Sequence, residues 1–437
     1  MRRIARTVRL VAQARREARV PFAASEEIRR IRRRRLHSML RHAHANVPFW
    51  RRILDGMGAR PEDFVDVDDL ARLPITTVTD FQAHPEMFAS SRHVGGDVLA
   101  VMSGGSTGEP KTVRHDAGAL LANAAHGERE RSIVARAVGK STGYREAVVA
   151  PPFSTVMAVQ DFVRPRIWLP RHAGVQRRYF SMLHDLDRVA GEVVAYRPHV
   201  IHGYGSFIGP LLRHMAEGAG IPVELRVVTY SSDSLAPSDR RFIQQSGRMV
   251  ISTYQAIEAF KIGFECGESE GLHVNVDLYP IRIVGEGGRD AAPGETGTVL
   301  VSNLVNRATV LLHYRIGDEA AFLAGGCPCG RTLPRITLPR GRDQDWVELA
   351  DGRRVHPQGV RTLFTDESEI RTYQIVQLAP GRFDLLMVPS PGADCEAIAR
   401  RLREKFARRF GDQVIELRWV DGLERTASGK IRSVIRR

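Results

Sequence analysis

Lysine is scarce in this chain of 437 residues and occurs only as Lys111, Lys140, Lys261, Lys405 and Lys430. Lysine and arginine together number 64 against 50 acidic residues, so arginine carries almost all of the net charge of +14. A basic balance suits nucleic acid, an anionic membrane surface or a phosphate-rich ligand, and charge alone does not choose among them. This scarcity is informative where a lysine falls on a motif position, as Lys111 and Lys430 do, because arginine's planar fork cannot replace a compact point charge there.

Long apolar runs are also absent. No stretch approaches the ~18 consecutive apolar residues of a membrane span. Arginines interrupt the apolar positions of residues 1–20, so this segment lacks the hydrophobic core of a secretory signal. We therefore expect a cytoplasmic protein, and a basic amphipathic helix that rests on lipid stays open for residues 1–20.

The chain contains neither internal repeats nor low-complexity tracts. Its hydrophobic content of 43% and charged content of 26% are typical of a folded globular protein. A length of 437 residues exceeds what one hydrophobic core usually supports. The composition therefore predicts a large domain with a smaller one, and the arginine-rich run 29–35 is most simply a solvated helix face.

Apolar periodicity predicts how the large domain is built. Apolar residues recur at helical spacing over 26–45, and Pro48 stops the pattern. Short apolar runs then alternate with helical stretches, which is typical of a layered α/β fold. These expected strands are 98–102, 147–153, 227–230, 249–254 and 297–304.

The composition changes after Leu338. Residues 339–345, PRGRDQD, form a short charged segment that reads as a linker. Beyond it we expect a small α+β unit: strands 372–378 and 382–388 around a Pro380/Gly381 turn, helix 395–410 and a last strand at 413–420.

Residues 103–111, SGGSTGEPK, follow the expected strand 98–102 directly. Their glycines allow backbone amides to turn toward an anion, and the hydroxyls and the lysine add donors and charge. The loop is not a Walker A motif, because Pro110 stands where that motif needs glycine. A flexible glycine-serine loop is the alternative. The candidate phosphate-binding residues are Ser103, Gly104, Gly105, Ser106, Thr107, Gly108 and Lys111.

This loop resembles the phosphate-binding loop of the adenylate-forming superfamily, which includes acyl-CoA ligases, synthetase adenylation domains and luciferases. Residues 254–258, YQAIE, resemble the family's Tyr-Gly-x-Thr-Glu motif. The resemblance implies that Tyr254 packs on adenine and that Glu258 holds magnesium. YRIGD at 314–318 resembles Tyr-Arg-Thr-Gly-Asp and implies that Asp318 binds the ribose hydroxyls of ATP.

The resemblance continues to the C-terminus. Residues 341–357 are similar to the family's interdomain hinge, which implies that Arg342 lies near the ribose and that Gln344 takes a hinge position usually held by an acidic residue or lysine. RTASGKIR at 425–432 resembles the motif whose lysine, here Lys430, contacts the carboxylate during adenylation. The expected catalytic residues are therefore Lys430 and Glu258. The implied fold is an AMP-binding domain at 1–340, a hinge at 341–345 and a mobile α+β domain at 346–437.

The segment LHSMLRHAHANVPFWRR, residues 36–52, extends the resemblance toward the phenylacetate-CoA ligase branch. The branch implies that ATP and Mg²⁺ activate a carboxylic acid, aryl or similar, as an acyl-AMP that is then transferred to coenzyme A. The implied partners are these small molecules; nucleic acid is disfavoured, and a homodimer stays open.

Two departures keep other functions open. Gln255 replaces the family's glycine and Ile257 its threonine, which removes a hydroxyl near the α-phosphate. The alternatives are an acceptor other than coenzyme A, a non-carboxylate substrate in secondary metabolism or capsule synthesis, or a degenerate zinc-stabilised scaffold protein.

A second set of residues has the composition of a metal site. Cys266, His273, Cys327 and Cys329 offer three thiols and one imidazole, a tetrahedral set suited to structural Zn²⁺. Reduced structural cysteines, as expected for Cys395, are the alternative. A subset of the phenylacetate-CoA ligase-like proteins carries a similar arrangement.

The resemblance places the acid pocket between strand ends and the segment of Tyr254, although most residues there read equally well as ordinary loop residues. The candidates are Pro152, Phe153, Tyr204, Gly205, Ser206 and Ser232.

Overall fold

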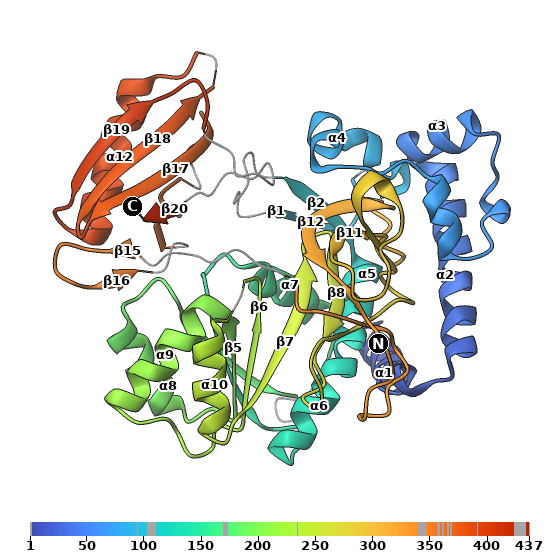
Figure 1. Ribbon diagram of the computed structural model, residues 1–437, viewed down its shortest axis with the longest axis horizontal. Helices are drawn as coiled ribbons and strands as arrows, with labels where there is room; N and C mark the ends of the chain where they lie inside the picture. The colour runs from blue at the N-terminus through green and yellow to red at the C-terminus, as the bar shows by residue number, and fades with distance from the viewer. Residues whose placement is uncertain are drawn as a thin grey trace.

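The computed structural model describes residues 2–93, 95–102, 111–168, 174–233, 235–339, 347–355, 359–360, 362–364, 367, 369–390, 392–423 and 434–436. Figure 1 shows a large body and, at its upper left, a smaller unit formed by the strands after residue 347. The arrangement is the expected α/β body with an α+β unit at the C-terminal end.

A nine-stranded mixed sheet organises the large body, in the order β13-β14-β9-β8-β7-β6-β5-β3-β4. Its parallel strands are β3 (Arg145–Ala150), β4 (Gln176–Ser181), β5 (Val200–Tyr204), β6 (Val227–Ser231) and β7 (Met249–Ala256). Its antiparallel strands are β8 (Ala259–Phe264), β9 (Leu272–Val274), β13 (Phe322–Leu323) and β14 (Arg335–Ile336). Every residue of β6, VVTYS, is buried, as expected for a parallel strand covered on both faces.

Helices connect the parallel strands and cover the sheet. Asp185 caps α8 by accepting a hydrogen bond from the Arg188 amide, and Arg197 ends that helix in a left-handed conformation. Leu211 of α9 packs with Ile201 and Val228 in one core cluster. The helices of the large body between residues 117 and 245 include α5 (Ala117–His126), α6 (Glu128–Val138), α7 (Thr155–Val163), α8 (Leu186–Tyr196), α9 (Gly205–Glu217) and α10 (Pro237–Gln245).

Two of the N-terminal helices form a second apolar core cluster together with Leu304, Val310 and Leu312. Helix α2 (Ser25–Asn46) confirms the expected helix within a residue at each end, and Pro48 begins α3 (Pro48–Gly56), where its missing N–H has no cost. The buried Trp50 donates to the carbonyl of Val310 at 2.9 Å. The other two helices are α1 (Arg2–Glu17) and α4 (Val78–Ala83).

Two small antiparallel sheets complete the large body. Strands β1 (Val98–Met102) and β2 (Thr112–Asp116) pair with Met102 opposite Thr112, so residues 103–110 join two neighbouring strand ends. The second sheet has the order β10-β11-β12, with β10 (Ile281–Val284), β11 (Gly297–Val301) and β12 (Tyr314–Ala320). Short 3-10 helices occur at Val20–Phe22, Pro61–Asp63, Val67–Arg72, Pro85–Phe88, Ser91–His93, Arg164–Arg166, Glu286–Gly288 and Thr362–Phe364.

The C-terminal unit has its own core, in which Leu385, Ile398 and Phe406 are fully buried. Its four-stranded sheet has the order β19-β18-β17-β20 and is covered by α12. The hairpin and the helix confirm the sequence-based expectation. The elements are β15 (Val347–Glu348), β16 (Arg354–Val355), β17 (Ile370–Ala379), β18 (Arg382–Pro389), α12 (Cys395–Phe410), β19 (Val414–Trp419) and β20 (Val434–Arg436).

Some strands differ from the expectation. The run 413–420 is not the last strand, because β20 follows and pairs in parallel with β17. Strand β3 ends at Ala150 because Pro151 cannot donate a backbone hydrogen bond to the neighbouring strand. Strand β11 ends at Val301, and the Asn303 side chain then stabilises a turn by accepting a hydrogen bond from the Val305 amide.

Among the residues that the structure describes, none of the helices has the length and hydrophobicity of a membrane span.

Candidate functional site

Lys111, Glu258 and Tyr314 lie together although they are far apart in the sequence. Lys111 precedes β2, Glu258 occupies the turn between β7 and β8, and Tyr314 begins β12. The Lys111 ammonium forms an ion pair with the Glu258 carboxylate and donates a hydrogen bond to the Tyr314 hydroxyl at 3.3 Å. The Glu258 side chain is only 3% exposed, so the pair lies where charges interact more strongly than in water.

Tyr314 contributes a neutral hydroxyl to this cluster. Burial and the neighbouring Glu258 carboxylate raise the pKa of Tyr314 well above its usual value. The phenol therefore keeps its proton and hydrogen-bonds to Glu258. The Lys111 ammonium also lies 5.5 Å from the centre of the Tyr314 ring, within cation–π range. The motif that contains Tyr314 did not predict a role for this side chain.

Two buried side chains fix the backbone that carries Glu258. His115 Nε2 lies 2.8 Å from the carbonyl of Ile257, and Asn303 Nδ2 donates to the carbonyl of Glu258 at 2.6 Å. Burial lowers the pKa of His115 to about 4, so the ring is neutral at pH 7 and its Nε2–H is the donor. Neither residue was predicted to belong to the site. Asn303 lies in the apolar run 297–304, which the sequence singled out only as an expected strand.

Tyr254 and Asp318 link the segments 254–258 and 314–318, which are also connected by the contact between Glu258 and Tyr314. The Tyr254 hydroxyl of β7 donates to Asp318 Oδ2 of β12 at 2.8 Å. Burial and then the Asp318 charge raise the pKa of Tyr254 well above its usual value, so the phenol stays a donor. The structure therefore brings together the two residues that the sequence associated with adenine and ribose.

The two departures from the family pattern have visible consequences. Gln255 Nε2 donates to Thr253 Oγ1 at 2.9 Å, so the amide bonds back onto its own strand. The half-buried Ile257 packs against the apolar cluster that contains Val101, Leu120 and Phe260. Position 257 thus contributes to packing and offers no hydroxyl.

The candidate pocket residues lie at one edge of the large sheet. Phe153 follows β3, Tyr204 and Gly205 end β5 and begin α9, and Ser232 follows β6. The carboxyl ends of parallel strands meet at this edge, where open α/β sheets bind ligands. Ser232 has a φ of 75°, an uncommon conformation for serine that clusters at functional sites. Phe153 is 57% exposed and Gly205 is buried. Pro152 and Ser206 are their neighbours in sequence, after β3 and at the start of α9.

Several expected site residues lie outside the described residues. They are Ser103, Gly104, Gly105, Ser106, Thr107, Gly108, Arg342, Gln344 and Lys430.

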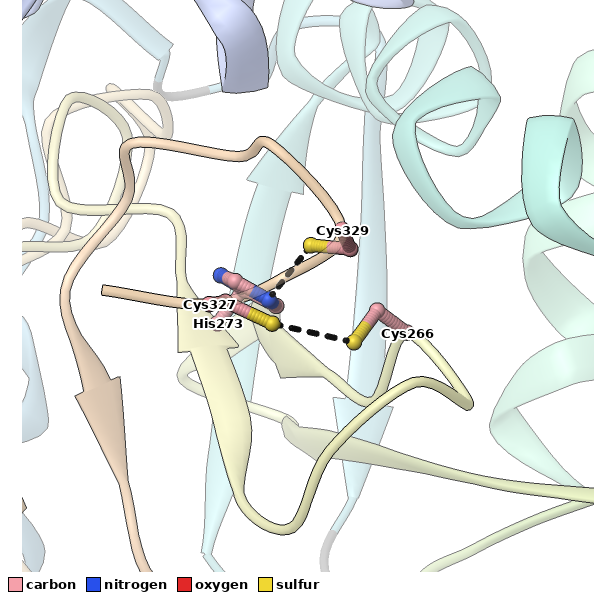
Figure 2. Close-up of side chains that lie close together, drawn as sticks. All are labelled: Cys266, His273, Cys327 and Cys329. Atoms are coloured by element: carbon pink, nitrogen blue, oxygen red, sulfur yellow. Dashed lines mark hydrogen bonds between the residues drawn. The ribbon is translucent and has the colours of Figure 1, made fainter. Parts of the chain in front are cut away.

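The four metal-ligand candidates converge, as Figure 2 shows. Cys266 follows β8, His273 lies in β9, and Cys327 and Cys329 belong to the loop between β13 and β14. Their ligand atoms all lie within 4.8 Å of one another, with Cys266 Sγ 3.6 Å from Cys327 Sγ and Cys329 Sγ 3.4 Å from His273 Nε2. A tetrahedral zinc with Zn–S bonds of about 2.3 Å requires sulfur atoms about 3.8 Å apart, so the donor set fits this metal.

The surroundings of the four ligands also suit a metal. His273 Nδ1 lies 3.3 Å from the carbonyl of Leu333, which leaves Nε2 to face the thiols. Burial raises the pKa of the Cys266 thiol, but hydrogen bonds from the amides of Glu268 and Ser269 outweigh this and lower it overall. Thiolate is the form that binds metal.

A family model, the CapK C-terminal domain, matches residues 347–437. The phenylacetate-coenzyme A ligase of Thermus thermophilus is 25% identical over 403 residues, which cover 89% of this chain and 85% of the relative. That of Escherichia coli is 24% identical and covers 75% of this chain and 74% of the relative.

Solved structures show the same fold. A 2-hydroxyisobutyryl-CoA ligase, crystallised with 2-HIB-AMP and CoA, has a TM-score of 0.62 at 18% identity and covers 96% of this chain and 91% of the other. The fold, the match of the C-terminal domain and the similarity to two ligases over 89% and 75% of this chain agree with the ordered motifs. The chain is therefore similar in sequence to phenylacetate-coenzyme A ligases and shares the fold of a CoA ligase, and its residues 347–437 match the CapK C-terminal domain family.

Proposed function

We propose that this chain activates a carboxylic acid, aryl or similar, with ATP and transfers the acyl group to coenzyme A. The observation that carries the proposal is the cluster of Lys111, Glu258 and Tyr314 beside the Tyr254–Asp318 hydrogen bond. It unites three sequence segments whose family counterparts handle ATP. The relatives whose names are phenylacetate-coenzyme A ligase support the same reaction class.

The reaction has two displacements. In the first, a carboxylate oxygen attacks the α-phosphorus of ATP, the bond to the β-phosphate oxygen breaks, and pyrophosphate leaves. In the second, the thiol of coenzyme A attacks the acyl carbonyl, loses its proton, and AMP leaves. Neither displacement requires a protein nucleophile, so the protein contributes mainly positioning and electrostatic stabilisation.

The described residues supply part of that stabilisation. Lys111 places a compact positive charge where phosphate oxygens bind, and Tyr314 holds the ammonium in place by its hydroxyl and ring. Tyr254 and Asp318 form the nucleoside side of the site. Lys430, which belongs to the C-terminal motif, is proposed to contact the carboxylate and the ribose, with Arg342 near the ribose. Gln344 lies in the proposed hinge.

The carboxylate of Glu258 is a suitable ligand for Mg²⁺. Mg²⁺ prefers carboxylate oxygens and is usually held by one or two of them together with substrate phosphates. Bound there, it would supply positive charge to the phosphate groups. His115 and Asn303 keep the Glu258 backbone in place for this role.

The acceptor is tested separately from the adenylation, because Ile257 changes the family pattern near the α-phosphate. Purified protein is incubated with ATP, MgCl₂ and a panel of aryl and fatty acids, with and without coenzyme A. Mass spectrometry then measures acyl-AMP and acyl-CoA. Acyl-CoA formation with one class of acid supports the proposal; acyl-AMP that persists unchanged when coenzyme A is added would instead indicate a different acceptor.

We also propose that Cys266, His273, Cys327 and Cys329 hold a structural Zn²⁺. Four protein ligands leave no open position for a water molecule, so this zinc would stabilise the fold and take no part in the chemistry. It would join the ends of β8, β9 and the β13–β14 loop at the antiparallel end of the sheet.

A further inference from the structure

One face of helix α1 is fixed to the large body. The Arg3 guanidinium donates two hydrogen bonds to the carbonyl of Ile167, at 2.8 and 3.1 Å. At the other end of the helix, Glu17 is buried and forms ion pairs with Arg129 and Arg35. The helix is therefore held along its length, and the direction of its outer face is set by these contacts.

The outer face is apolar although it is exposed. Ile4, Val8 and Val11 are 52%, 63% and 40% exposed, and their spacing places them on adjacent turns of one side of α1. Trp168 is 51% exposed, and its backbone N–H donates to Thr7 Oγ1 at 2.8 Å, between the turns of Ile4 and Val11. These four side chains form an apolar strip, defined here as Ile4, Val8, Val11 and Trp168.

Positive charge flanks the apolar strip. Arg6, Arg9, Arg15 and Arg16 are exposed, and residues 2–16 contain no acidic side chain. Isolated exposed apolar residues are ordinary on protein surfaces, whereas exposed apolar side chains gathered on one side of a basic helix are typical of an interaction surface. An aliphatic strip with a tryptophan and a basic flank matches the interfacial region of a bilayer whose lipids are anionic.

We propose that α1 and Trp168 bind an anionic phospholipid surface, with the helix in the plane of the membrane. The apolar strip enters the boundary between headgroups and acyl chains, while the arginines contact lipid phosphates. A second copy of this chain is a poorer occupant, because it would bring two arginine-rich helices together. Figure 1 shows α1 at the lower right of the large body, away from the C-terminal unit, so a membrane on this face leaves that unit accessible.

Vesicle sedimentation tests this proposal on the full-length protein. Binding is measured to vesicles of phosphatidylcholine alone and to vesicles with one quarter phosphatidylglycerol, each at low and at high salt. We expect binding to the anionic vesicles at low salt, at least about tenfold weaker binding to neutral vesicles, and a loss of binding as salt screens the arginines.

Matched variants separate the two contributions. Ile4→Ser/Val8→Ser removes apolar area and should weaken vesicle binding about tenfold, whereas Val65→Ser/Val223→Ser changes side chains that are 56% and 74% exposed elsewhere and should not. For charge, Arg6→Gln/Arg9→Gln/Arg16→Gln should weaken binding about 100-fold at low salt. The control with the same charge change is the triple glutamine variant at the exposed positions Arg400, Arg403 and Arg408 of α12.

Three results would overturn the proposal. The first is an absence of vesicle binding by the wild type, and the second is equal loss of binding in the α1 variants and their controls. The third is a dimer, seen by analytical ultracentrifugation without vesicles, that Ile4→Ser/Val8→Ser dissociates; the apolar strip would then be an interface between copies. Binding to vesicles requires no catalysis, so these outcomes are independent of the proposed reaction.

Discussion

At the scale of residues, the site depends on a few buried polar side chains that fix one another. Lys111 touches both Glu258 and Tyr314, while His115 and Asn303 hold the backbone carbonyls of Ile257 and Glu258. Burying two opposite charges costs desolvation energy, and their mutual attraction and further hydrogen bonds offset it. Removal of one partner therefore leaves the other charge buried and unpaired.

The first prediction concerns Lys111. We expect Lys111→Ala to lower the rate of acid-dependent ATP–pyrophosphate exchange about 100-fold, the usual effect of removing one preorganised group that stabilises transition-state charge. Lys111→Arg should not restore the rate, because the planar guanidinium cannot replace a compact ammonium beside Tyr314. Lys140→Ala, the same change at an exposed lysine, is the control. Unchanged exchange by Lys111→Ala would remove Lys111 from the site.

The second prediction concerns pH and stability. The pKa of His115 falls from 6.5 to about 4 on folding, because the ring is buried. Between these values the unfolded chain binds the additional proton, so acidification favours unfolding, by up to about 1.4 kcal/mol per pH unit from this one group. We expect the urea midpoint of the wild type to fall more steeply between pH 7 and pH 5 than that of His115→Gln. Parallel midpoints for the two proteins would contradict the assignment, and His84→Gln, at an exposed histidine, serves as the control.

Short ordered motifs point to candidate site residues in the sequence, but they do not reveal residues that act through the fold. Tyr254, Glu258 and Asp318 are candidates because each stands at a fixed place in its motif, and their roles stay predictions. Arg129 was not found, since nothing in the sequence separates it from the many solvated arginines. In the structure it is 1% exposed and pairs with Glu17 and Asp277.

At the scale of elements, the expected helices and strands were most accurate where one periodicity is sustained. Helix α2 and the β17–β18 hairpin were predicted within about two residues, because their apolar positions repeat over several turns or several pleats. Strand β20 was missed, since Val434–Arg436 is too short to show a period and forms only by pairing with β17. The helical form of α1 was left open because arginines interrupt its apolar positions.

The third prediction concerns the zinc proposal at the antiparallel end of the large sheet. We expect the purified protein to contain about one zinc per chain by elemental analysis, and Cys327→Ser to lose the metal and to unfold at a lower temperature. Cys395→Ser is the matched control, because Cys395 is the first residue of α12 in the C-terminal unit and is not one of the four converging ligands. Full zinc content in Cys327→Ser would show that the cluster is not the metal site.

At the scale of the whole molecule, the order of the motifs along the chain predicted the fold better than any single motif did. Segments at 111, 254–258 and 314–318 meet in one place, as their resemblance to one family requires. The substrate could not be predicted, because its candidate pocket is formed by loop residues after β3, β5 and β6 that have no distinctive pattern. The hinge at 341–345 between the two domains and the role of Lys430 stay predictions.

The most direct measurement of the central claim is ATP–pyrophosphate exchange across aryl and fatty acids. The wild type is compared with Lys430→Ala and with the control Lys140→Ala. We predict exchange that depends on one class of acid, is lost in Lys430→Ala and is retained in Lys140→Ala. Measurable ATP binding without exchange for any acid would contradict acid adenylation and favour a non-carboxylate substrate or a scaffold.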